Sequence, residues 1–229
     1  MKKFFTLIAA VAMAASVNAQ TITFTEYAKG AAPKTVSNGS LVLTITDTNK
    51  TSVDKNSQYF GTADSYVKFD TRFKSGGKTS ISSSTKLPTN NYLTINLPSD
   101  GTLKVYARTG SIDATDRNIV LTQDGTELVN KVLLESEAVK VNMEIDGQTV
   151  EKNVYPVVSV AAKAGDVVIT YPTNSVNIYG IELATATGVS SVSVAEAKAK
   201  TATYNLAGQQ VSESYKGIVV KNGKKYLNK

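Results

Sequence analysis

The arginines are the residues of this sequence with the most specific binding chemistry. Only Arg72, Arg108 and Arg117 are arginine among 25 basic side chains, and the others are lysine. A guanidinium is a rigid fork of donors that can bind a carboxylate at two points, whereas lysine offers a single charge. Grouped together, the arginines would suit an acidic ligand. Alternatively, Arg108 or Arg117 could form a structural ion pair with Asp113 or Asp116.

Residues 103–108 place one arginine beside a tyrosine. Apolar and polar side chains alternate here, as in a strand whose neighbouring residues point to opposite faces. The core face carries Leu103, Val105 and Ala107, and the other face carries Lys104, Tyr106 and Arg108. A tyrosine between cations can stack on a sugar ring while the cations bind a uronate carboxylate. We therefore predict a glycan-binding site formed by Tyr106, Arg108, Lys104, Arg72 and Arg117.

Several kinds of catalytic site are excluded by composition. The sequence has no Cys, no His and no Trp, so it has neither a Ser–His–Asp relay nor a thiolate zinc site. Glycoside hydrolysis uses two carboxylates about 5–10 Å apart. The available acids show no alternating triad of the kind found in jelly-roll hydrolases: Glu135, Glu137, Glu144 and Asp146. We expect no catalytic residues and no enzymatic activity.

One segment has the oxygen spacing of a calcium loop. Asp47, Asn49 and Thr51 supply oxygen atoms at positions 1, 3 and 5 of such a loop. Its sixth position is Ser52 instead of Gly, and its twelfth is Gln58 instead of Glu. An ordinary polar loop is the default interpretation. We expect no cofactor, leave a structural calcium ion open, and identify no complete set of metal ligands.

The N-terminal segment has the features of a signal peptide. Residues 1–3 are positively charged, residues 4–15 are apolar, and residues 17–19 place small side chains before a cleavage point at Gln20. The apolar run is shorter than the roughly 20 residues of a membrane span. We therefore predict export, with no membrane span in the mature chain. The lysines are scattered at a net charge of +6, which does not indicate nucleic-acid binding.

The pattern between residues 20 and 185 has a period of two and predicts strands. Turn residues such as Asp100-Gly101, Asp124-Gly125 and Asp146-Gly147 separate short alternating segments. The predicted strands cover residues 41–45, 92–97, 103–108, 119–121, 139–145, 157–160, 167–171 and 176–183. This spacing favours an all-β, jelly-roll-like β-sandwich.

Two local features of this sandwich are also predicted. Residues 92–97 and 103–108 are expected to pair as a hairpin across Asp100-Gly101. Within residues 176–183 the apolar phase changes at Tyr179-Gly180, which predicts a β-bulge.

The chain closes with a small C-terminal β-module. Residues 186–201 are small and polar and read as a linker. Residues 202–229 contain three short strand-like segments, and Asn222-Gly223 between the last two is a strong hairpin signal.

The C-terminal residues resemble a known sorting domain. YNLAGQ at residues 204–209 and KGIVVKNGKK at residues 216–225 occur in the order seen in the C-terminal sorting domain of the Por-type (type IX) secretion system. The resemblance covers roughly residues 189–229. It implies contact with secretion machinery and release to the cell surface or the medium. A small β-appendage with a structural role is the alternative, and the protein would then remain in the periplasm.

The central residues resemble a second family. TRFKSGG at residues 71–77, TLKVYAR at 102–108, DRNI at 116–119 and SVNIYGIEL at 175–183 are similar to the non-catalytic β-sandwich modules attached to secreted pectate lyases. This resemblance implies a carbohydrate-binding module with polysaccharide or another glycan as its partner. We therefore expect an exported, non-catalytic protein that binds acidic, uronate-bearing polysaccharide at the cell surface. A structural or adhesin-like sandwich without glycan binding is the alternative.

Overall fold

The computed structural model describes residues 19–47, 50–185, 203–205, 210–212, 215–221 and 224–228. The chain divides into two compact units, residues 1–187 and residues 188–229. Except for residue 19, the predicted signal peptide lies outside the described residues, and so does the whole predicted linker. The described part of the chain contains no helix that could cross a membrane.

The first unit contains a sheet of six antiparallel strands, which we call sheet B. Its order is β11-β10-β15-β8-β3-β2. The strands, in chain order, are β2 (Thr35–Asn38), β3 (Leu41–Ile45), β8 (Leu93–Leu97), β10 (Asn118–Gln123), β11 (Thr126–Val132) and β15 (Gly165–Thr170).

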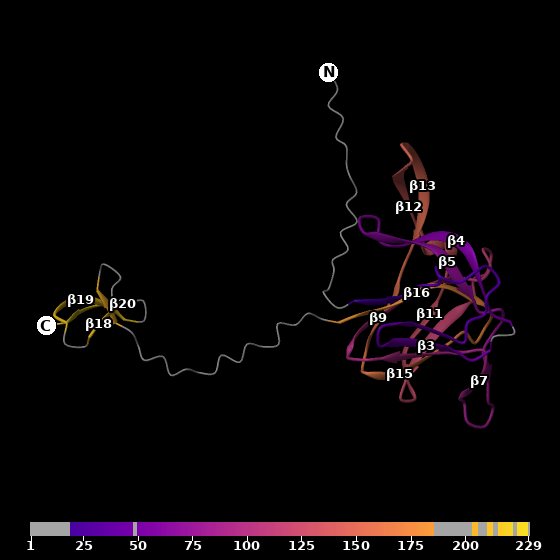
Figure 1. The fold of residues 1–229 in the computed structure, drawn as a ribbon, viewed down its shortest axis with the longest axis horizontal. Coiled ribbons are helices and arrows are strands. Elements are labelled where there is room, and N and C mark those ends of the chain that lie inside the picture. The colour runs from indigo at the N-terminus through magenta and orange to yellow at the C-terminus, as the bar shows by residue number, and fades with distance from the viewer. Residues whose placement is uncertain are drawn as a thin grey trace, which may run out of the picture. The chain divides into compact units, whose positions relative to one another are not determined.

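Sheet A has eight strands and contains one parallel pair. Its order is β12-β13-β4-β5-β16-β9-β14, and β1 also pairs with β16. The strands are β1 (Gln20–Ile22), β4 (Ser52–Gly61), β5 (Tyr66–Lys74), β9 (Gly101–Thr109), β12 (Val139–Ile145), β13 (Gln148–Tyr155), β14 (Val158–Ala162) and β16 (Val176–Ala184). Only the end of β13, Val154 and Tyr155, pairs with β4, and it does so in parallel. The rest of the β12–β13 hairpin extends beyond the sandwich (Figure 1).

The core forms because both sheets alternate apolar and polar side chains. Leu103, Val105 and Ala107 of β9 are buried in one cluster with side chains of both sheets, as the alternation predicted. The structure confirms the all-β class, since the only helical element it describes is one 3-10 turn, η1 (Glu135–Glu137).

Sheet A carries a second apolar cluster on its outer face. This outer aromatic cluster consists of Phe60, Tyr106, Tyr155 and Tyr179, and Phe69 packs against it. The Phe60 and Tyr179 ring centroids lie 5.0 Å apart, and those of Phe69 and Tyr106 lie 4.7 Å apart. The cluster joins four strands of sheet A on the side away from sheet B.

Two β-bulges shape the outer face. The predicted change of phase in β16 is confirmed, because the register with β9 shifts between Ile178 and Gly180. Ile178 therefore packs into the main core while Tyr179 joins the outer aromatic cluster. A second bulge lies in β4 between Lys55 and Gln58, where two residues oppose a single residue of β5.

The predicted pairing of residues 92–97 with residues 103–108 is wrong. β8 lies in sheet B and β9 in sheet A, so the connection around Pro98 crosses between the sheets. The polar segment around Asn56, interpreted from the sequence as a loop, is part of strand β4. By contrast, Asp124-Gly125 and Asp146-Gly147 do form two-residue hairpin turns, with the positive φ values that such turns require.

The second unit contains a four-stranded antiparallel sheet in the order β18-β17-β19-β20. Its strands are β17 (Thr203–Asn205), β18 (Gln210–Val211), β19 (Gly217–Lys221) and β20 (Lys224–Asn228). β19 and β20 pair from Gly217↔Asn228 to Lys221↔Lys224, so the predicted hairpin is present. A short two-stranded sheet, β6 (Ser80–Ile81) with β7 (Pro88–Asn90), belongs to the first unit.

Candidate functional site

Tyr106 does not form the open stacking platform expected from the sequence. Its face assignment is correct, but the side chain is only 4% exposed because Phe60 and Phe69 pack over it. Its hydroxyl donates to Glu182 Oε2 at 2.7 Å. Burial raises the pKa of Tyr106 above its ordinary value, and the bond to Glu182 adds to this shift. Tyr106 is therefore a structural tyrosine.

The cations on this face are paired with carboxylates. Lys104 Nζ lies 2.8 Å from Glu182 Oε1. Arg72 binds Asp54 with two donors, Nε to Oδ1 at 2.7 Å and Nη2 to Oδ2 at 3.1 Å. Burial alone would raise the pKa of Asp54, but the hydrogen bond and charge of Arg72 lower it overall. Since these charges are balanced, neither cation offers a ligand its full attraction.

Arg117 does not join the other predicted residues. Its Nη1 donates to the carbonyl oxygen and to Oγ of Ser175, at 3.0 and 2.6 Å, just before β16 begins. The structure thus places Arg72 and Arg108 beside Tyr179. It joins Lys104 and Tyr106 through Glu182 and places Arg117 with Ser175. Neither Arg108 nor Arg117 uses the aspartates expected from the sequence, since Arg108 binds Glu135.

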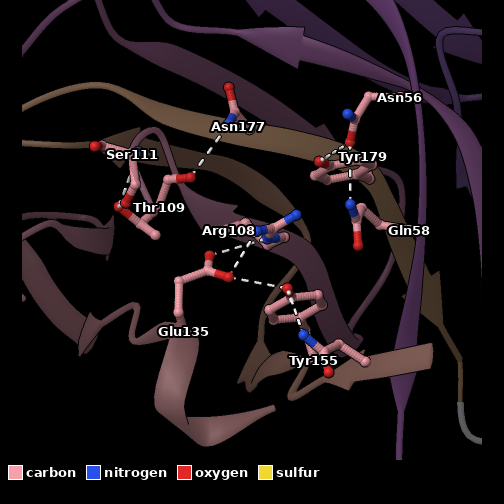
Figure 2. A network of polar contacts seen from close by, with 10 residues as sticks. Asn56, Gln58, Arg108, Thr109, Ser111, Glu135, Tyr155, Asn177 and Tyr179 are labelled. Atoms are coloured by element: carbon pink, nitrogen blue, oxygen red, sulfur yellow. Dashed lines mark hydrogen bonds and ion pairs between the residues drawn. The ribbon is translucent and has the colours of Figure 1, made fainter. Parts of the chain in front are cut away.

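Arg108 is the centre of a polar network on the outer face. Its Nε and Nη2 donate to the two oxygens of Glu135 at 3.0 and 2.6 Å, and its guanidinium lies 4.2 Å from the ring centroid of Tyr155. The Tyr155 hydroxyl donates to Glu135 Oε2 at 2.9 Å. In Figure 2 Arg108 lies between Glu135 on one side and Tyr179 and Gln58 on the other. This network fixes the position of the guanidinium, which lines two neighbouring hollows of the surface.

The bulge in β4 is tied into the same region. The Tyr179 hydroxyl donates to Asn56 Oδ1 at 2.7 Å, and Gln58 Nε2 donates to the same oxygen at 3.2 Å (Figure 2). Burial raises the pKa of Tyr179, although the charges of Arg108 and Arg72 oppose this shift. The hydrogen bond between Tyr179 and Asn56 therefore connects the bulge of β16 to the bulge of β4. This connection fixes the direction of the β4 side chains that follow.

The larger hollow lies between β4, β5 and the projecting hairpin, and we call it the hairpin groove. It has a volume of about 520 Å³. It is lined by Ser57, Gln58, Tyr59, Lys68, Arg108, Ile145, Glu151, Lys152, Asn153 and Tyr155. Such a lining combines an aromatic ring with amides, a hydroxyl and cations, which are the groups that bind sugar rings, hydroxyls and carboxylates.

The groove carries an excess of positive charge. Its one carboxylate, Glu151, pairs with Lys140, and Lys68 pairs with Asp70, both in exposed ion pairs of low strength. Lys152 makes no salt bridge with any described residue. Lys152 is therefore the cation best able to attract an acidic ligand here.

Sequence reasoning missed most of the groove. Of its residues only Arg108 was predicted, while Gln58, Tyr59, Lys152 and Asn153 were not. The lining comes from two strand pairs joined only by the short parallel contact of β13 with β4, and nothing in the local pattern indicates that contact. Asn153 and Tyr155 have the two-residue spacing of one strand face, which was the only available signal.

The calcium-like segment is described only in part. In the calcium-like segment, Asn49 lies outside the described residues, and Asp47 is buried and accepts a hydrogen bond from Asn90 Nδ2 at 3.2 Å. No group of three or more acidic side chains suited to a metal ion occurs among the described residues. A structural calcium ion therefore stays an untested expectation.

Comparisons with known proteins give weak likenesses of fold. No family model matches the sequence, and no curated protein matches it. A cleaved adhesin domain of Lys-gingipain from Porphyromonas gingivalis W83 is similar at 11% identity and a TM-score of 0.36, over 73% of this chain and 98% of that chain. The catalytic domain of a GH87 α-1,3-glucanase is similar at 7% identity and a TM-score of 0.30, over 69% of this chain and 29% of that one. The chain thus spans under a third of the glucanase, and neither likeness bears on its function.

Proposed function

We propose that the protein is an exported, non-catalytic carbohydrate-binding β-sandwich that holds an acidic polysaccharide in the hairpin groove. The observation that carries the proposal is the lining of that groove, in which Tyr59 and Lys152 lie among amides and a hydroxyl. Its volume of about 520 Å³ falls in the range of roughly 300–1,000 Å³ typical of small-ligand sites.

In the groove, an aromatic ring would bind the face of a sugar, and polar side chains would bind its carboxylate and hydroxyl groups. Tyr59 is half-buried, and its edge-on contact with Tyr66, with ring centroids 5.9 Å apart, holds the ring in place for stacking on a sugar. Lys152 would bind the uronate carboxylate, while Gln58 and Asn153 would bind hydroxyls. Glu135 is a poor candidate for a catalytic acid or base beside the groove, because both of its oxygens already accept hydrogen bonds from Arg108 and Tyr155.

Affinity electrophoresis through gels containing polygalacturonate tests this proposal. We expect retardation of the wild type, reduced retardation of Lys152→Gln, and no change for Lys163→Gln. Lys163 is a matched control, since it is 80% exposed at the turn between β14 and β15 and lines neither hollow. Equal migration of all three proteins with and without the polysaccharide would reject the groove as a site for acidic glycan.

The destination of the protein is part of the proposal. The signal peptide at residues 1–19 would direct export, and the C-terminal unit would act as a sorting module that brings the protein to the surface or the medium. Support comes from the sequence resemblance of residues 189–229 and from the separate compactness of this unit.

A protein-interaction role is the second candidate, and one observation favours it. β12 is the edge strand of sheet A, and its hairpin projects from the sandwich, so its outer edge could accept a strand from another protein (Figure 1). An adhesin-like role of this kind would depend on β12 and would be indifferent to Lys152.

A further inference from the structure

The outer edge of β12 is open along its whole length. β12 pairs with β13 in continuous register, and no described strand pairs with its other side. The hairpin also extends beyond the sandwich (Figure 1). Such an edge is a row of N–H and C=O groups that can bind another strand, and proteins commonly protect it with a bulge or a proline. β11, at the edge of sheet B, has a register shift, whereas β12 contains no bulge, no Pro and no Gly.

The turn of the hairpin determines which backbone groups of β12 face outward. Asp146-Gly147 is a two-residue turn, so the residues that flank it, Ile145 and Gln148, form a hydrogen-bonded pair. Hydrogen-bonded and non-hydrogen-bonded pairs alternate along an antiparallel ladder. Every second residue of β12, counted back from Ile145, therefore bonds to β13. The residues between them direct their N–H and C=O groups to the open side: Lys140, Asn142 and Glu144.

The side chains of these three residues lie on one face of the hairpin and are exposed. Lys140 is 69% exposed, and Glu151 of the same chain is its partner in a surface ion pair of low strength. Glu144 accepts a hydrogen bond from Thr149 and makes no salt bridge with any described residue. The open edge of β12 thus presents a positive, a neutral and a negative side chain in that order.

This order is complementary to itself when a second β12 lies antiparallel. With Asn142 opposite Asn142 of the partner subunit, each Lys140 lies opposite Glu144 of the partner subunit. The apolar residues of the other face then also lie opposite one another, Val141 with Met143 and Val139 with Ile145. Opposite charges and apolar pairs directly across stabilise antiparallel strands, and like charges destabilise them.

Other ways of pairing two copies of β12 lack this complementarity. A register shifted by two residues in either direction leaves neither Lys140 opposite Glu144. Parallel pairing in register places each lysine beside a lysine and each glutamate beside a glutamate. The charges therefore favour one arrangement, in which the two-fold axis passes beside Asn142.

We infer that β12 pairs with the β12 of a second copy of this chain, in an antiparallel dimer centred on Asn142. Each strand runs from the base of its hairpin at Val139 to the tip at Ile145, so this pairing places the two sandwiches at opposite ends of the joined hairpins. The contact consists of two short strands and is small, so we expect a dissociation constant in the micromolar range. The inference names a partner for the open edge and does not depend on glycan binding in the hairpin groove.

Sedimentation velocity of the mature chain, combined with charge reversal, tests the inference. The wild type should shift from monomer to dimer as its concentration rises through the micromolar range. Lys140→Glu alone or Glu144→Lys alone brings like charges together at two places, so each should raise the dissociation constant about tenfold or more. In an equimolar mixture, the two acidic side chains of one variant lie opposite the two lysines of the other. The mixture should therefore form a dimer with an affinity near that of the wild type.

Lys163→Glu is the matched control and should dimerise like the wild type. It reverses the charge of another exposed lysine that is paired with an acid, and this lysine lies outside β12. Circular dichroism confirms that each variant is folded. A wild type that stays monomeric at every concentration overturns the inference and leaves the polygalacturonate test of the groove unaffected. A dimer that persists in both single variants, or a mixture that stays monomeric, also overturns it, because the contact would then lie elsewhere or in another register.

Discussion

At the scale of single residues, the alternation of apolar and polar side chains correctly predicted the strand face on which Tyr106 lies. It did not predict that other side chains cover this face. Tyr106 points to the face of β9 opposite to that of Val105 and Ala107, as the alternation required, yet its side chain is buried. The covering rings come from β4 and β5, more than 30 residues away along the chain. Such long-range contacts leave no mark in the pattern of one strand.

Truncation of Tyr106 should therefore affect stability first. Tyr106→Ala removes a buried ring from the outer aromatic cluster, and we expect it to lower the free energy of unfolding by about 3–5 kcal/mol. Tyr106→Phe loses only the hydroxyl bond to Glu182, and about 1–2 kcal/mol is expected. Urea unfolding followed by circular dichroism measures both. Loss of glycan binding by Tyr106→Ala at unchanged stability would contradict the structural role of this residue.

Four buried tyrosines should titrate above the ordinary pKa of a tyrosine side chain. Burial raises the pKa values of Tyr106, Tyr155, Tyr171 and Tyr179 above the ordinary value of 10.0. The folded state then holds these protons more tightly than the unfolded state, so their stabilising contribution is complete below pH 10 and is lost as the pH rises above it. The sequence has 11 Tyr and no Trp, so ultraviolet absorbance of tyrosinate can follow the titration. A single step near pH 10 for all tyrosines of the folded protein would contradict this assignment.

At the scale of elements, the bulges decide where the candidate site forms. The bulge in β16 could be predicted because Gly180 and the change of apolar phase mark it. The bulge in β4 contains Asn56 and Ser57 and has no glycine or apolar signal, so the strand itself was missed. The hairpin between residues 92–97 and 103–108 was wrong for a related reason. Alternation identifies the faces of a strand but leaves open which strand lies beside it.

Gly180 is required by the close approach of Phe69 to the bulge. A Cβ at this position would lie 2.5 Å from Phe69 Cε1 and 3.2 Å from the carbonyl oxygen of Ile22. Because Phe69 is held by Phe60 and Tyr106, we expect Gly180→Ala to cost about 1–3 kcal/mol of stability. Gly77→Ala is the matched control, since the nearest atom would be Asn91 Nδ2 at 3.6 Å. Thermal unfolding compares the two, and equal melting temperatures would show that the bulge tolerates a side chain.

At the scale of the whole molecule, the two compact units suggest separable roles. Deletion of residues 189–229 should leave the first unit folded, because its core and its outer aromatic cluster are formed by residues 22–183. We expect a cooperative unfolding transition like that of the full chain. In the producing cell, the shortened protein should move from the surface or medium to the periplasm. Unchanged localisation on cell fractionation would argue for a structural appendage instead of a sorting module.

The central claim is that the hairpin groove binds an acidic glycan, and calorimetric titration of one ligand tests it most directly. A galacturonate oligosaccharide is titrated into the wild type and Tyr59→Ala at low and high salt. Loss of stacking should weaken binding by about 1 kcal/mol, or roughly fivefold, at both salt concentrations. Wild-type affinity should fall as salt rises, because exposed charges are screened within about 10 Å at 0.1 M. No binding by the wild type, or equal affinity of wild type and Tyr59→Ala, would contradict the account.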